Sequence, residues 1–416
     1  MRRATLLVAG IVIVITCGAL HPARAQDGDK SLGTTLEGLL TVSRQLSPSL
    51  RAAALDTAAA AAKAEGADAL DDPMLSAGYQ YYRNPNVFSG VAVTVTQSFP
   101  LWGKRDLRRQ VALADTAAAR GREQSTQDES DERIKVAFAQ YYAISRQMAV
   151  NRNIVGVARR MSAAASARYG QGGGSQADII QALSEETTAK IEIARLEGER
   201  NAIRARIDAL IARPVDAPLA APTRLPVRGT ADPVLSVLLE RARAANPVLS
   251  AGGAEVEAAR ARQTLADKAW YPDLTIGAGP LIQTNHQPVG VAATIGVNIP
   301  VPWGREASQQ REAAAQLSAT QQRYDAAWLN IQGAVAESVA KHQAARSTEA
   351  LRRQALPQAR ATMQSLLAGY SQGKGDLAAV IAAEHRTHDV ELLLLKAELD
   401  QQVELAAIER LIGGAL

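Results

Sequence analysis

The segment Phe99-Pro100-Leu101-Trp102-Gly103-Lys104 returns about 200 residues later as Pro300-Val301-Pro302-Trp303-Gly304-Arg305. Three further pairs of segments match in the same order at nearly the same spacing. They are Ser47-Pro48 with Asn246-Pro247, Asp72-Pro73-Met74-Leu75 with Tyr271-Pro272-Asp273-Leu274, and Arg168-Tyr169-Gly170-Gln171-Gly172 with Gly369-Tyr370-Ser371-Gln372-Gly373. Matches in one order are not expected by chance, and this period is far longer than a solenoid unit. The sequence therefore predicts one fold made of two duplicated halves.

Each half contains a β-hairpin just before the repeated Trp-Gly segment. Apolar residues alternate with small or polar ones over 74–83 and again over 91–99, which is the period of a strand with two different faces. We therefore expect a hairpin over 74–100, and a second one over 274–300 in the other half. Each strand is about ten residues long, the length that crosses a bilayer at a tilt.

A very long helix follows each hairpin. Residues 104–169 contain no proline, and their apolar residues recur at steps of three and four, which predicts coiled-coil packing. Residues 305–370 repeat this pattern, and a helix of that length reaches roughly 100 Å. Gly156 and Pro357 occupy matching positions in the two long helices. Because both residues weaken a helix, we expect a hinge at each.

The remaining segments complete the two halves. Glycine-rich turns end the long helices, and shorter helices are expected over 176–212 and 376–412. A helix is also expected at the start of each half, about 34–70 and 234–270. Pro48 lies inside the first of these, which predicts that its first turns are separate or kinked. The segment 213–233 holds five prolines and cannot be a helix. It is predicted to link a first half at 26–212 to a second half at 234–416.

The first 25 residues have the features of an export signal. Arg2 and Arg3 precede an apolar run, and Ala23-Arg24-Ala25 is a typical cleavage site. A second interpretation takes the segment ending at Cys17 as a lipid-attachment box, which Thr16 fits poorly. Cys17 is the only cysteine, so removal of residues 1–25 would leave no thiolate ligand or disulfide.

The composition excludes several functions. Charged residues make up 21% of the chain and aromatic residues 4%, which is typical of long packed helices. Without the first 25 residues, the basic and acidic residues nearly balance, so charge gives no indication of nucleic-acid binding. No phosphate-binding loop or nucleophile elbow has the required spacing. We expect no enzyme activity and no cofactor; His385 and His388, three residues apart on a helix, are weak candidates for a metal site.

The geometry predicts an assembly rather than a single copy. Two short helices end to end match one long helix in length, which makes a long bundle with four strands at one end. Four strands alone leave exposed edges, whereas three copies would pool twelve strands, a size usual for outer-membrane barrels. The alternative is an ordinary sheet packed on helices in a periplasmic coiled-coil scaffold or adaptor.

The repeat, the Asn-Pro-x-Leu segment at 246–249, the strand entries at Pro73 and Pro272, and the Tyr-x-x-Gly turns at 169–172 and 370–373 together resemble the TolC-type outer-membrane factors. The resemblance covers essentially all of the chain after residue 25. The segment 99–105 is also similar to a junction frequent in the heavy-metal, CzcC-like branch of that family.

The resemblance implies a homotrimer in the outer membrane of a Gram-negative cell, with a twelve-stranded barrel in the lipid and a helical tunnel in the periplasm. Its partners would be a periplasmic adaptor and an inner-membrane pump of the resistance-nodulation-division type. It would form a passive efflux duct, with heavy-metal cations as the expected cargo; the alternative within the same fold is a duct for drugs or proteins.

The resemblance places the periplasmic tip and its gate at the glycine turns. Some members carry two acidic residues in the helix after the second turn, at positions that are Ala379 and Ala382 in this chain. Acidic rings select cations, so this departure moves the expected charges to Lys374 and Asp376, which would otherwise be solvated turn and N-cap residues. The expected tip and gate residues are Tyr169, Gly172, Asp178, Tyr370, Gly373, Lys374 and Asp376.

Overall fold

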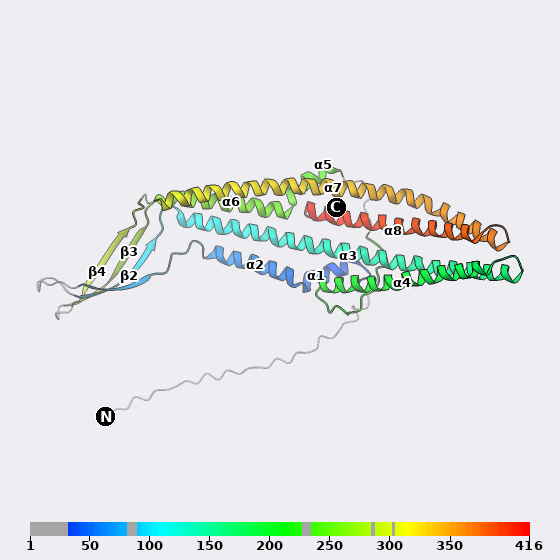
Figure 1. The fold of residues 1–416 in the computed structure, drawn as a ribbon. Helices are drawn as coiled ribbons and strands as arrows, with labels where there is room; N and C mark the ends of the chain where they lie inside the picture. Colours follow the sequence, from blue (N-terminus) through cyan, green and yellow to red (C-terminus); the bar gives the residue numbers. More distant parts are fainter. Residues whose placement is uncertain (1–31, 81–89, 227–233, 284–287, 302–303) are drawn as a thin grey trace, which may run out of the picture.

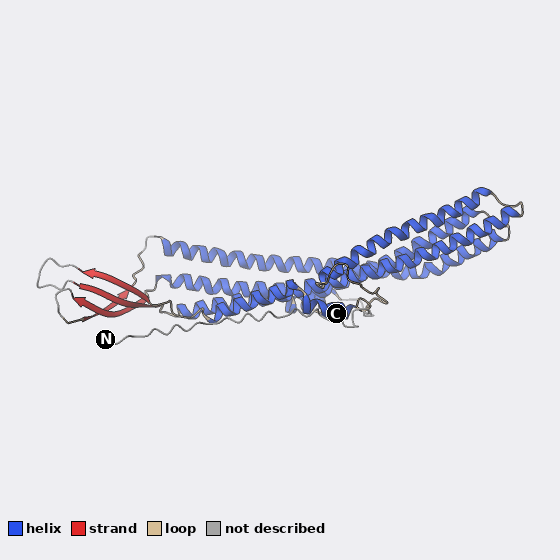
Figure 2. Cartoon of the chain, turned by 90° about the horizontal axis from the view of Figure 1, so that it is seen from below, coloured by secondary structure: helices blue, strands red, loops and turns tan. Residues whose placement is uncertain are grey.

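The computed structural model describes residues 32–80, 90–226, 234–283, 288–301 and 304–416. The chain is strongly elongated (Figure 1). Its strands lie at one end, and the two tight turns that connect helices lie at the other. Figure 2 shows that the helical part is not straight, because the part that carries the turns is inclined to the part beside the strands. The expected export signal at 1–25, Trp303 and the tips of both hairpins lie outside the described residues.

The two halves have the same order of elements. The first half comprises α1 (Leu36–Leu46), α2 (Pro48–Glu65), β1 (Met74–Gln80), β2 (Gly90–Phe99), α3 (Lys104–Gly170) and α4 (Gln176–Leu210). The second comprises α5 (Leu235–Ala245), α6 (Pro247–Asp267), a short 3-10 turn (Lys268–Trp270), β3 (Leu274–Gln283), β4 (Gly290–Val297), α7 (Arg305–Ser371) and α8 (Leu377–Ile412).

The first helical segment of each half is two helices, α1 and α2 in the first half, where a break was expected at Pro48, and α5 and α6 in the second. A single helix over 234–270 is wrong because the chain is extended at Asn246, whose side chain accepts hydrogen bonds from the backbone N–H groups of Val248 and Leu249 at 2.9 and 3.1 Å. That is N-cap geometry. Pro247 then occupies the first helical position, where its missing N–H costs nothing. The same break occurs at Ser47 and Pro48.

The four strands form one antiparallel sheet in the order β1-β2-β3-β4, so β2 and β3 join the two halves. The register aligns residues of one kind on each face. One face carries almost only apolar side chains; on β3 and β4 these are Leu274, Ile276, Ala278, Pro280, Ile282, Val291, Ala293, Ile295 and Val297. The other face carries small and polar residues, including Ser76, Thr94, Thr96, Thr275, Gly277, Gly279 and Thr294. An apolar outer face and a polar inner face are the pattern of an outer-membrane barrel.

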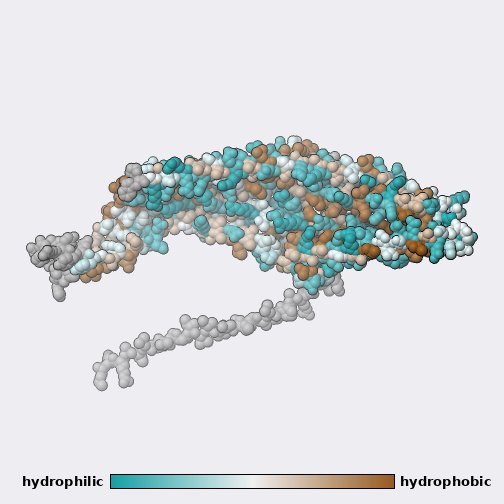
Figure 3. Space-filling model, in the orientation of Figure 1, coloured by the Kyte–Doolittle hydropathy of each residue, from teal (hydrophilic) through white to brown (hydrophobic). Residues whose placement is uncertain are grey.

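The apolar face of the sheet is exposed in a single copy. Val291 and Ile295 are 83% and 78% exposed, which is unusual for large apolar side chains in a soluble sheet. Figure 3 shows hydrophobic residues at the strand end of the visible face, whereas the helices present a mixed surface. No helix in the described part of the chain has an apolar stretch long enough to cross a membrane.

A network of polar contacts joins the strands to the first long helix. The Lys104 ammonium, which is 8% exposed, lies 2.9 Å from both carboxylate oxygens of Asp273 and donates to the Tyr271 carbonyl at 2.8 Å. The indole of Trp102 donates to the Pro272 carbonyl at 2.7 Å. Gly103 turns the chain with a φ of 74°, where a glycine avoids the steric cost of a side chain. The second hairpin is thereby fixed to the helix of the first half.

The helices pack in the order α2-α3-α6-α7, with α4 along α3 and α8 along both α7 and α3. Each half has its own apolar core, built around Ile134, Phe138 and Tyr141 in one half and around Ile331 and Val335 in the other. Ion pairs between Lys135 and Glu409 and between Glu132 and Arg410, both at 2.6 Å, link α3 to α8 in mid-bundle. A third core lies near the turns and draws residues from both halves.

Candidate functional site

The candidate site is the end of the helical bundle farthest from the strands, where α3 turns into α4 and α7 into α8 (Figure 1). Gly172, Gly373 and Gly375 have φ angles of 77°, 80° and 101°. Because side chains are strained in this conformation, glycine permits these sharp reversals. The two repeated Tyr-x-x-Gly segments therefore form equivalent turns side by side at the tip.

Three side chains connect the two turns. The hydroxyl of Tyr370 donates a hydrogen bond to Asp178 Oδ2 at 2.8 Å. The guanidinium of Arg168 lies 4.4 Å from the centre of the Tyr370 ring and donates to the carbonyls of Gly173 and Gly375 at 3.2 and 3.4 Å. We call Arg168, Asp178 and Tyr370 the tip latch. It joins the first half of the chain to the second.

The latch is partly withdrawn from water. Tyr370 is only 1% exposed, and its ring belongs to the core shared by both halves, with Met161 and Leu377. Burial, together with the hydrogen bond to Asp178, raises the pKa of Tyr370 to about 12. The phenol thus remains a hydrogen-bond donor at any physiological pH.

The tip residues expected from the sequence divide into two groups. Asp178 and Tyr370 meet in the latch, and Gly172 and Gly373 make the turns. Tyr169 is 52% exposed although it occupies the position in the first half that Tyr370 occupies in the second. Lys374 and Asp376 are exposed, and Asp376 is the N-cap residue of α8 without a side-chain capping bond. Arg168 was not among the expected residues, and its place beside Tyr169 in a repeated turn is the only signal for it.

His385 and His388 have different surroundings. His385 Nε2 lies 3.0 Å from Glu185 Oε2 on α4, whereas Nε2 of His388 is buried without a hydrogen-bond partner among the described residues. Glu384 beside them is 7% exposed. Within the described ranges, no group of three or more His, Cys, Asp or Glu residues could hold a metal ion.

Gly156 and Pro357 lie inside continuous helices. α3 runs unbroken through Gly156, and α7 runs unbroken through Pro357 from Arg305 to Ser371. A proline in a helix interior removes one backbone hydrogen bond and weakens the helix locally. Both sites therefore remain predicted hinges.

The repeat agrees with a known family. The model of the outer membrane efflux protein family matches residues 39–213 and again 238–414, once in each half. The chain belongs to this family. This outer-membrane efflux protein is therefore a transport duct rather than an enzyme, located in the outer membrane with a helical extension in the periplasm.

One curated relative of this outer-membrane efflux protein is the cobalt-zinc-cadmium resistance protein CzcC of Cupriavidus metallidurans. The two are 25% identical over 329 residues, which cover 75% of this chain and 74% of the relative.

Solved channels share the fold. The outer membrane protein VceC of Vibrio cholerae matches with a TM-score of 0.78 at 18% identity, covering 91% of this chain and 96% of VceC. The open state of the MtrE outer membrane channel of Neisseria gonorrhoeae matches with a TM-score of 0.75 at 17% identity, covering 92% and 90%. The strand end of this efflux protein thus corresponds to a membrane barrel and its helices to a tunnel.

The contact between α4 and α8 in this efflux protein should depend on pH. Burial raises the pKa of Glu384 to about 6, and the hydrogen bond that the His385 ring donates to the Glu185 carboxylate raises the pKa of His385. A raised histidine pKa stabilises the fold at low pH, and this contribution is lost as the pH rises through that pKa. The raised pKa of Glu384 lowers the stability of the fold as the pH rises from 4.5, the ordinary value of this carboxyl, to about 6. Both groups therefore make the fold more stable at acidic pH.

We expect the melting temperature of the detergent-purified protein to fall between pH 4.5 and pH 7.5. The fall between pH 4.5 and pH 6 should be smaller in the Glu384→Gln variant. Glu337→Gln, at an exposed residue paired with Lys341 on α7, is the matched control and should keep the wild-type slope. An identical pH dependence in wild type and Glu384→Gln would contradict the role of Glu384.

Proposed function

We propose that this protein is the homotrimeric exit duct of a tripartite efflux system that exports heavy-metal cations. The observation that carries the trimer is the two-faced sheet, in which β1 and β4 are the outer strands. Exposed strand edges are a liability unless they are paired. If β4 of each copy pairs with β1 of the next, three copies close a barrel of twelve strands, apolar outside and polar inside.

The proposed cargo rests on the relative and not on a binding site. CzcC is named for resistance to cobalt, zinc and cadmium, and the segment 99–105 resembles that branch. A wide duct needs no resident metal ligand, because the pump chooses the cargo and supplies the energy. Its proposed partners are therefore a periplasmic adaptor, which docks near the glycine turns, and an inner-membrane pump of the resistance-nodulation-division type.

The tip latch supports a role as the gate. It ties the two halves together at the end where a tunnel opening into the periplasm must close. Opening would separate Tyr370 from Asp178, with Gly156 and Pro357 absorbing the bend in the long helices.

Deleting the gene and measuring growth in zinc, cobalt, cadmium, copper, silver and hydrophobic drugs tests this proposal. Selective sensitivity to one group of metals is the expected result. Sensitivity to drugs alone would overturn the metal cargo but keep the duct. A purified protein that is not a trimer in outer-membrane fractions would overturn the duct itself.

Charge at the tip is the second test. Lys374 and Asp376 are exposed beside the second turn, and three copies would place three of each around the opening. Because rings of charge at a constriction select ions, Lys374→Glu and Asp376→Lys should shift the cation-to-anion permeability in opposite directions in planar bilayers. Unchanged reversal potentials in both variants would remove these residues from the pore.

A further inference from the structure

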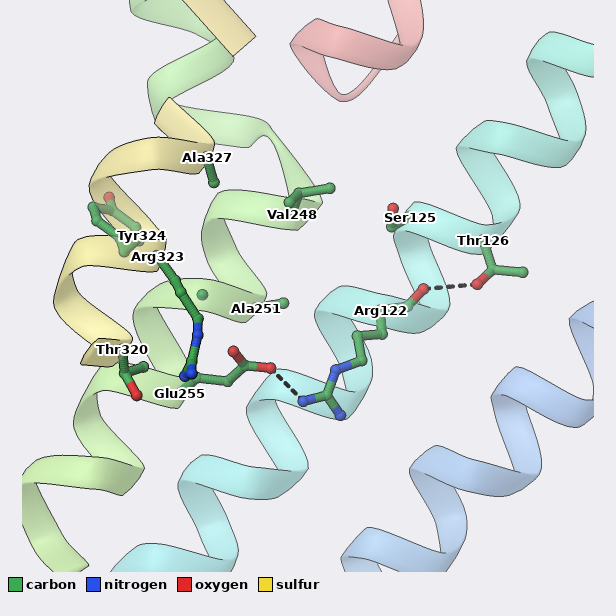
Figure 4. Close-up of a pocket in the computed structure, with 11 residues that line it drawn as sticks. Arg122, Ser125, Thr126, Val248, Ala251, Glu255, Thr320, Arg323, Tyr324 and Ala327 are labelled. Atoms are coloured by element: carbon green, nitrogen blue, oxygen red, sulfur yellow. Dashed lines mark hydrogen bonds and ion pairs between the residues drawn. The ribbon is translucent and has the colours of Figure 1, made fainter. Parts of the chain in front are cut away.

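The four helices nearest the strands form an open layer with two unequal sides. Figure 4 shows α7, α6, α3 and α2 following one another across the layer. α6 is covered on both sides, by α3 and α7, and buries five residues: Pro247, Leu249, Ala251, Ala258 and Ala259. α2, its counterpart in the first half, buries only Ala64. One side of α2 therefore lacks a neighbour that α6 has.

The contact between α3 and α6 shows what that neighbour provides. Arg122 on α3 forms an ion pair with Glu255 on α6 (Figure 4). Two turns away, Arg262 on α6 binds both carboxylate oxygens of Asp115 on α3 at 2.5 and 2.6 Å. This is one of the contacts that join the two halves of the chain.

The repeat places matching charges on the outer helices. α7 begins where α3 begins in the repeat, and α2 begins where α6 begins. The position of Arg122 is taken by Arg323 on α7, and the position of Glu255 by Asp56 on α2. Similarly, Lys63 on α2 corresponds to Arg262, and Gln316 on α7 to Asp115. The two outer helices thus carry an arginine (α7) and a carboxylate (α2) at the positions that pair in the contact between α3 and α6.

The two charged residues are available for such a contact. Arg323 lines a cavity of about 360 Å³ with Glu255, and Asp56 lines another of about 490 Å³ between α2 and α3. Both residues are exposed, and neither is in an ion pair with any residue that the structure describes. A lone arginine and a lone carboxylate at equivalent places are complementary.

We propose that α2 of a second copy docks on the free side of α7, with Arg323 paired to Asp56 of the partner subunit. The inference rests on the proposed homotrimer and identifies the contact between its copies. A contact that joins one side of a subunit to the opposite side of the next is heterologous, and it closes into a ring when the rotation fits. The same rotation from one copy to the next would also pair β4 with β1 of the next copy.

The repeat also shows where the proposed contact between α7 and α2 of the next copy must differ from the contact between α3 and α6. At Gly121 on α3 the approach of α6 is so close that a Cβ would lie 2.8 Å from that of Ala251. The matching residue on α7 is Gln322, whose side chain requires more room. Arg323 also lies in the cavity beside α6 (Figure 4). We therefore expect a wider contact between copies, reached by Arg323 turning toward the partner.

Charge reversal with rescue is the test. Arg323→Glu and Asp56→Arg are each expected to shorten the half-life of the trimer in warm detergent about tenfold, because like charges then face each other. The double variant restores the pair and should recover most of that loss. Arg311→Glu, another exposed arginine on α7, is the control and should leave the half-life unchanged. Single reversals without rescue by the double variant would overturn the pairing.

Crosslinking gives an independent readout. A chain carrying Arg323→Cys and Asp56→Cys, treated in membranes with a short bismaleimide, should yield dimers and trimers on denaturing gels, whereas either single variant should not. The pair Arg122→Cys with Glu255→Cys should crosslink only within one chain. A wild-type protein that is not a trimer would refute the proposed function; a trimer that is neither crosslinked here nor weakened by charge reversal would refute this contact alone.

Discussion

Replacing Tyr370 with phenylalanine is expected to make the channel leak. The variant keeps the buried ring and its packing on Met161 and Leu377 but loses the hydrogen bond to Asp178. A hydrogen bond to a charged group contributes about 1.5–3 kcal/mol. Loss of this bond in each copy should shift the closed-to-open equilibrium about tenfold or more. Single-channel recording in planar bilayers should show a larger open fraction.

The repeat supplies the control for this experiment. Tyr169 occupies the equivalent turn, but it is 52% exposed and contributes nothing to the latch. Tyr169→Phe should therefore behave as wild type. If Tyr370→Phe has the same open fraction as Tyr169→Phe, the latch does not hold the tip closed. Asp178→Asn, which keeps an acceptor but removes the charge, should fall between wild type and Tyr370→Phe.

The arrangement of the fold was largely predictable because its signals are local. Alternation in 74–83 and 91–99 indicates strands, and the absence of proline in 104–169 indicates a long helix. In the part of the chain that the structure describes, β1, β2 and α3 occupy these places. The break at Asn246 was missed in the second half because an Asn-Pro pair fits both a helix start and a kink. Only the hydrogen bonds of the Asn246 side chain decide between them.

The tip was predictable only in part. Glycine in a reversal between helices is a local requirement, so the turns follow from the sequence. The latch does not, because Tyr169 and Tyr370 are equivalent in the repeat, and only the packing of the two halves buries one and exposes the other. The surroundings of the two histidines were not predictable for a similar reason. Their spacing on α8 follows from the sequence, but the hydrogen bond between His385 and Glu185 on α4 depends on how the helices pack.

Replacing Lys104 with methionine is expected to have the largest effect on assembly. The ammonium is 8% exposed and is the cation beside the Asp273 carboxylate, at the point where the second hairpin meets the first long helix. Methionine preserves the length of the side chain but leaves that carboxylate without its charge partner. Breaking a buried ion pair by removing one partner costs about 3–5 kcal/mol. Because Asp273 is 25% exposed, water offsets part of this cost, and we expect about 3 kcal/mol.

The lost ion pair is the one by which α3 of the first half positions the strands of the second half. We expect the Lys104→Met variant to yield far less heat-resistant trimer in outer-membrane fractions, while the helical content of the purified chain stays close to wild type. Arg305→Met is the matched control, since Arg305 holds the same place in the second half but is exposed. Normal trimer yield from Lys104→Met would mean that the turn at Gly103 and the strand pairing position the hairpins without this ion pair. The effect should be absent in Arg305→Met, because the halves are equivalent in sequence but only one of them uses this position to hold the other.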